Sequence, residues 1–132
     1  MPGRIVALDN GKAISMPIAL RELRKLNHEL VIHLDAAAFQ AAASPLRDAD
    51  AVIATVGFKV TARMLADAPR LRVVASTGIG VDIFDVDYAT KNGLVVAHSR
   101  APEHVIGMAE ASILLILACI HDLPGEIGRA HV

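Results

Sequence analysis

The stretch Leu71–Ser99, LRVVASTGIGVDIFDVDYATKNGLVVAHS, constrains the fold of this chain most strongly. It opens on an apolar run, Leu71–Ala75, of the kind that forms a strand buried on both faces. A turn of small residues follows, and then a short predicted helix at Asp85–Lys91. A second apolar run, Leu94–Ala97, predicts another buried strand. Together these segments predict one βαβ unit, in which ligand-binding residues lie at the carboxyl ends of the strands.

The same alternation of apolar runs and helix-forming segments extends towards the N-terminus. Further elements are predicted as strands at Ile5–Leu8, within Glu29–Leu34 and at Ala51–Thr55, and as helices at Ala36–Ala43 and from the Thr61 cap to Ala68. Strands that alternate with helices in this way predict an α/β fold. We expect a flavodoxin-like parallel five-stranded sheet with helices on both faces.

The segment between the first two predicted strands has the spacing of an amphipathic helix. Ala19, Leu23, Leu26 and Leu30 recur at helical intervals, and charged residues occupy the other side. We expect this helix to pack on the sheet through those four side chains. Because 54% of the chain is hydrophobic and only 3% is aromatic, the core should be aliphatic.

Charge and cysteine content exclude several classes of function. A net charge of -1 with mixed signs gives no basis for binding nucleic acid or an anionic membrane. The single cysteine cannot form an internal disulfide, and no pair of the six histidines has the helical spacing of metal ligands. The first residues carry no apolar signal core, so a cytoplasmic location is expected.

The glycine turn Gly78-Ile79-Gly80 resembles the start of a dinucleotide fingerprint but does not complete one. The fingerprint needs a small residue three positions later, where this chain has Ile83, and an acid about 20 residues on, where it has His98. Two alternatives remain for this turn. It is either a tight turn without a ligand, or an anion site in which the backbone amides face a small carboxylate.

The run GIGVDIFDVDYATKNGLVVAHS, followed by a proline-containing linker and MAEASILLILA, resembles the NAD-dependent D-2-hydroxyacid dehydrogenases, the phosphoglycerate dehydrogenase-like group. The resemblance implies that residues 1–100 form a substrate-binding domain. It implies that residues 101–132 are a crossing helix and the start of a nucleotide-binding domain. The family's NAD site and its catalytic Arg, Glu and His would follow Val132. We therefore expect a truncated chain without catalytic residues, inactive when isolated.

The same resemblance implies a site for a 2-hydroxy or 2-keto acid. The amides of the glycine turn would hold the substrate carboxylate, assisted by the loop after the third strand. The implied substrate-binding residues are Thr55, Val56, Gly57, Lys59, Ser76, Gly78, Ile79 and Gly80. This chain departs from the commoner family pattern, which has Arg-Ser at Thr55-Val56 and a basic residue at Ser76.

The apolar segment Val105–Ile120 is too short to span a bilayer and carries Glu110. Large aliphatic residues surround its predicted helix on every side, so a single neighbour cannot cover them. We expect a homodimer through this segment.

A second hypothesis is a non-enzymatic flavodoxin-like module for ligand sensing or interaction. A receiver domain is excluded, because it needs a phosphorylatable aspartate at the end of the third strand and Thr55 is there. A sensing domain needs only the glycine turn and the exposed helix, and it would bind its acid without NAD.

Overall fold

The computed structural model describes residues 2–13 and 15–122, which divide into two compact units at the boundary between Ser99 and Arg100. The first unit contains a five-stranded parallel sheet, as expected, in the order β2-β1-β3-β4-β5. Its strands are β1 Arg4–Leu8, β2 Glu29–His33, β3 Ala51–Ala54, β4 Val73–Ser76 and β5 Val95–His98. The flavodoxin-like α/β fold is thus confirmed.

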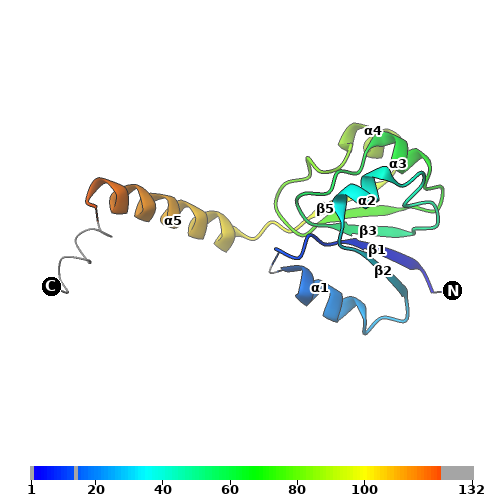
Figure 1. Ribbon diagram of the computed structural model, residues 1–132, viewed down its shortest axis with the longest axis horizontal. Helices are drawn as coiled ribbons and strands as arrows, with labels where there is room; N and C mark the ends of the chain where they lie inside the picture. Colours follow the sequence, from blue (N-terminus) through cyan, green and yellow to red (C-terminus); the bar gives the residue numbers. More distant parts are fainter. Residues whose placement is uncertain (1, 14, 123–132) are drawn as a thin grey trace. The chain divides into compact units, whose positions relative to one another are not determined.

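Helices lie on both faces of this sheet (Figure 1). One face carries α1, and the other carries α2, α3 and α4. Their bounds are α1 Ser15–Leu23, α2 Ala36–Ala41, α3 Ala62–Ala66 and α4 Val86–Lys91. The side chains of Asp35, Thr61 and Asp85 accept hydrogen bonds from the first turns of α2, α3 and α4, so the sequence itself fixes where these helices begin.

The two faces are buried to very different extents. The larger hydrophobic cluster lies between the sheet and α2, α3 and α4, and includes Val52, Val74 and Phe58. The smaller cluster consists of Ala7, Met16 and Leu20, with partly buried neighbours around it. The rings of Phe39 and Phe58 pack edge to face with centroids 5.7 Å apart, so two of the few aromatic residues lie in the core.

The prediction that Ala19, Leu23, Leu26 and Leu30 form the packing face of one helix is wrong. Met16 and Leu20 are the buried residues of α1, whereas Leu26 is exposed. The reason is that α1 ends at Leu23 and Leu30 already belongs to β2. The predicted face therefore combined residues of α1 with residues that follow it, including Leu30 of β2.

Several other boundaries differ by one or two residues. Strand β4 begins at Val73 and includes Ser76, whereas Thr55 lies just beyond β3. Helices α2 and α3 are each shorter than expected. At the end of α4, Gly93 has a φ of 70°, and the Leu94 amide donates to the Ala89 carbonyl. This is a Schellman ending, which glycine permits.

A charged network joins strands at their amino ends. Asp50 accepts hydrogen bonds from the Arg4 amide at 2.7 Å and from the Arg70 guanidinium at 2.8 Å, with a second bond from Arg70 Nε at 3.2 Å. The Arg4 N–H, together with Arg70 and the charge of Arg72, holds the pKa of Asp50 below its ordinary value of 3.8. The ionised carboxylate is thus the form that the fold stabilises.

Replacing Asp50 by Asn should make the free energy of unfolding fall less steeply as the pH is lowered into the acid range. A carboxyl group whose pKa is lowered by folding contributes fully above its unfolded value, and this contribution disappears as the pH falls below 3.8 and through the lowered pKa. Urea unfolding at a series of pH values would measure the effect. Asp67→Asn, at an exposed position after α3, is the control and should keep the original slope. The prediction would be contradicted if the free energy of unfolding fell equally steeply with decreasing pH in the Asp50 variant and in the parent.

The second unit contains α5, Pro102–Ile120, which includes the whole apolar segment Val105–Ile120. Proline occupies its first turn, where a missing amide hydrogen is tolerated. Among the described residues, no helix is long and apolar enough to cross a membrane. Residues 123–132, which belong to the expected start of a nucleotide-binding domain, lie outside the described residues.

Candidate functional site

The candidate site is at the carboxyl ends of the strands in the first unit. The parallel register places Ala54 of β3 opposite Ser76 of β4, and Ser76 opposite His98 of β5. The residues that follow these strands therefore leave the same edge of the sheet side by side. Bonds from Thr77 N to Ala54 O and from Ser99 N to Gly78 O, both of 3.0 Å, extend this contact beyond the strands.

Thr55, directly after β3, supports the loops at this edge. Its side chain is 1% exposed, and its hydroxyl donates to the Leu8 carbonyl at 3.2 Å. The same oxygen accepts a hydrogen bond from the Asn10 amide. The threonine hydroxyl is thus engaged inside the protein, between the loops that follow β1 and β3.

Asn10 is a site residue that the sequence analysis missed. Its amide nitrogen Nδ2 donates to the Val56 carbonyl at 2.6 Å, and its Oδ1 accepts from the Lys12 amide. Beside it, Gly57 has a φ of 101°, and an added Cβ would lie 3.4 Å from Asn10 Nδ2. Glycine is required at this position by its backbone conformation, and Asn10 holds the loop in place.

Ser76 and Gly78 form a small turn after β4. Ser76 is buried, and its hydroxyl oxygen accepts a hydrogen bond from the Gly78 amide at 3.2 Å. Neither Gly78 nor Gly80 has a positive φ, so this turn does not need the left-handed backbone that only glycine adopts readily. At Gly78 and Gly80, the feature of glycine that matters is its lack of a side chain, which leaves space next to the backbone.

Free backbone amides collect on these two loops. Across the described part of the chain, the amides of Val56, Gly57, Ile79 and Gly80 donate no hydrogen bond. Adjacent unpaired N–H groups form concavities that bind anions. The Asp82 carboxylate opposes this, because its Oδ1 lies 2.6 Å from the position of a Cβ built on Gly80.

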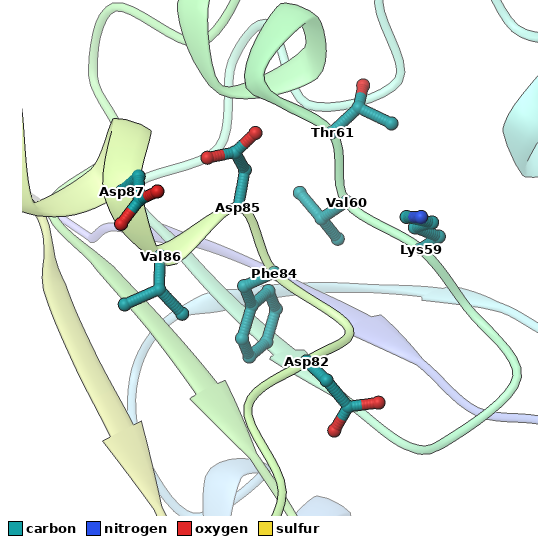
Figure 2. A pocket seen from close by; sticks show the side chains of 8 residues that line it. All are labelled: Lys59, Val60, Thr61, Asp82, Phe84, Asp85, Val86 and Asp87. Carbon is teal, nitrogen blue, oxygen red and sulfur yellow. The ribbon is translucent and has the colours of Figure 1, made fainter.

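Lys59 lines a separate hollow of about 550 Å³ (Figure 2). This hollow lies where the segment after β3 pairs with the segment before α4, through Val60 N to Ile83 O at 2.8 Å. Its charged lining is Lys59, Asp82, Asp85 and Asp87. Gly78, Ile79 and Gly80 are not among the lining residues. The structure therefore does not place Lys59 in one cavity with the glycine turn.

Metal and nucleotide sites find no support in the described residues. The part of the chain that the structure describes has no group of three His, Cys, Asp or Glu side chains able to hold a metal ion. Ile83 is buried in the main hydrophobic cluster, at the position where a dinucleotide fingerprint needs a small residue. The glycine turn is therefore unsuited to a pyrophosphate.

Comparison with known proteins identifies the family. The profile described as "D-isomer specific 2-hydroxyacid dehydrogenase, catalytic domain" matches residues 6–110. The chain belongs to this family. Among curated family members, the D-3-phosphoglycerate dehydrogenase of Methanocaldococcus jannaschii is 36% identical over 80 residues, which are 60% of this chain and 15% of the relative. The glyoxylate reductase of Thermofilum pendens is 34% identical over 73 residues, which are 55% of this chain and 21% of the relative.

A solved structure of the family has the same fold. The D-lactate dehydrogenase of Aquifex aeolicus, complexed with NAD and lactic acid, is 27% identical with a TM-score of 0.65. The match covers 86% of this chain and 33% of that one. This chain thus spans well under half the length of the relatives it matches.

Proposed function

We propose that residues 1–100 are the substrate-binding domain of an oxidoreductase that acts on 2-hydroxy and 2-keto acids with NAD(H). The observation that carries the proposal is the group of free amides at Val56, Gly57, Ile79 and Gly80 on neighbouring loops. Backbone N–H groups form short, strong hydrogen bonds with a carboxylate. Family membership supports the same class of substrate.

In this proposal the domain contributes binding and orientation. The amides hold the carboxylate of the acid, and this fixes the direction in which its second carbon points. The buried hydroxyls of Thr55 and Ser76 keep the loops in position, and Ser76 acts through its bond to the Gly78 amide. No residue of this chain is assigned as catalytic, so the isolated chain is expected to be inactive.

The proposal that the protein uses NAD rests only on its membership of this family. A bound NAD supplies or accepts a hydride, and the protein positions it against the substrate. The described residues do not fit this group, because the buried Ile83 side chain occupies the place of the small residue that a pyrophosphate turn needs. We propose residues 101–132 as a crossing helix and the start of a nucleotide-binding domain.

The partner proposed for α5 is a second copy of the chain. Large aliphatic side chains along this helix are exposed, among them Val105, Ile113, Leu115 and Ile120. Within the described part of its own unit, α5 is the only regular element. Pairing of two such helices in a homodimer through Val105–Ile120 would remove these side chains from water.

Replacing Gly80 by Val should abolish the binding of a 2-keto acid. The first carbon of the new side chain would lie 2.6 Å from Asp82 Oδ1, so the Asp82 carboxylate must move, and the branched side chain would crowd the space beside the Gly80 amide. A ligand that binds only the folded state raises its melting temperature. We expect excess pyruvate to raise the melting temperature of the parent chain and not that of the variant.

Two further variants make this experiment specific. Gly3→Ala, at the opposite edge of the sheet, adds a carbon at an ordinary 3.6 Å from its neighbours and should keep the response. Asp82→Asn removes the opposing charge beside Gly80 and should enlarge the response. The proposal fails if pyruvate stabilises the parent and the Gly80 variant equally, or if it stabilises neither the parent nor the Asp82 variant.

A further inference from the structure

Exposed aliphatic side chains flank the free amides of the candidate site. Val56, in the loop after β3, is 66% exposed, and Ile79, in the loop after β4, is 42% exposed. Single exposed aliphatic residues are common on protein surfaces. Here, however, they occupy the two loops that also carry the free amides, so an acid held by those amides would meet apolar side chains next to its carboxylate.

The basic residues near this edge are Lys12, Lys59, His98 and Arg100. Lys59 lines the neighbouring hollow together with Asp82, Asp85 and Asp87. Lys12 follows β1 in the same loop as Asp9. No arginine is present in the loop 55–59 or in the turn 76–80. Neither of the two loops that carry the free amides therefore supplies a guanidinium of its own to balance the charge of a phosphate or a second carboxylate.

We infer that the substrate is a monoacid with a short, uncharged, apolar tail that contacts Val56 and Ile79. The inference rests on the proposed function, and it names the class of acid that the site accepts. It also distinguishes this chain from its relatives named D-3-phosphoglycerate dehydrogenase, whose name refers to a phosphorylated acid. Val56 and Ile79 then determine specificity at this site.

The test is a titration of the nitrogen-15-labelled full chain, followed by NMR chemical shifts, which also detect weak binding. The probes are pyruvate, 4-methyl-2-oxopentanoate and 3-phosphooxy-2-oxopropanoate. We expect all three carboxylates to shift the amides of Ile79 and Gly80. The branched apolar acid has three more carbons than pyruvate and should bind at least tenfold more tightly, because one methylene group in an apolar contact already contributes about tenfold or more. The phosphorylated acid should bind more weakly than pyruvate.

A charge variant tests the role of the loop directly. Val56→Arg should reverse the order of affinity, so that the phosphorylated acid binds at least tenfold more tightly than it binds the parent, and more tightly than pyruvate binds the same variant. The matched control is Val95→Arg, because Val95 is 61% exposed and lies in β5, opposite Val73 near the amino ends of the strands. Val95→Arg should bind the three acids in the same order of affinity as the parent. That result would exclude a general effect of added positive charge.

The outcomes separate this inference from the proposed function. If pyruvate shifts the glycine-turn amides but the phosphorylated acid binds the parent equally or more tightly, the apolar-tail inference is wrong and the proposed function stands. The inference is also wrong if Val56→Arg leaves the order unchanged. If none of the three acids shifts Ile79 or Gly80, the proposed function fails and the inference fails with it.

Discussion

Replacing Phe58 by Ala should lower the free energy of unfolding by about 3–5 kcal/mol, the usual cost of removing a buried aromatic ring. Phe58 is fully buried in the main hydrophobic cluster and packs edge to face against Phe39. It also belongs to the loop after β3, so its ring anchors the segment that carries Val56 and Gly57. Urea unfolding followed by circular dichroism would measure the change.

The matched control is Val56→Ala, two residues earlier in the same loop. Because this side chain is mostly exposed, its truncation should change the free energy of unfolding by no more than about 0.5 kcal/mol. Comparable losses in the two variants would show that the loop does not pack as described. A double-mutant cycle with Phe39→Ala would isolate the contact between the rings, which we expect to contribute about 0.5–1.5 kcal/mol.

The charged pair Leu115→Glu and Leu117→Lys should convert a dimer of this chain into monomers. Both leucines are exposed on α5, and two residues apart on a helix they point to nearly opposite sides. A helix-helix interface then buries one of them in each copy. Because burying one such side chain contributes about 1.5–3 kcal/mol, losing it from both copies should raise the dissociation constant at least a hundredfold, at about tenfold per 1.4 kcal/mol. Size exclusion coupled to light scattering would measure the mass at each concentration.

The control makes the same charge changes outside α5. Ile18→Glu with Leu34→Lys alters two exposed aliphatic residues of the first unit and should leave the dimer intact. A parent chain that is monomeric at high micromolar concentration would contradict the dimer, and so would a control that dissociates as readily as the α5 variant.

The fold was predictable from this sequence because parallel strands are buried on both faces. Each strand then contains a short apolar run, such as Val73–Ala75 or Val95–Ala97, and the segments between the strands contain capping residues. The apolar stripe of α1 could not be predicted in the same way. Leu26 and Leu30 have helical spacing, but the chain leaves the helix after Leu23 and starts β2. Spacing alone does not locate that boundary.

The site was predictable in part. The spacing of Gly78 and Gly80 after an apolar run indicated the edge of the sheet where the free amides lie. The role of Asn10 could not be inferred, because its bond to the Val56 carbonyl spans 46 positions of the sequence. The segment Asp9-Asn10-Gly11 has the composition of an ordinary turn. The pairing of Lys59 with an acidic hollow likewise depends on a bridge between distant segments.

The bonds that join these loops also affect how much conformational entropy ligand binding costs. Asn10 ties the first loop to the third, Thr55 ties the third to the end of β1, and Ser99 ties the last loop to Gly78. Restricting one backbone residue to a single conformation costs about 1–2 kcal/mol of conformational entropy. In these loops the restriction occurs when the protein folds, so it does not reduce the affinity for a ligand. A small acid offers few contacts, so its affinity depends on loops that are already ordered when it arrives. Asn10 can therefore influence affinity without touching the ligand.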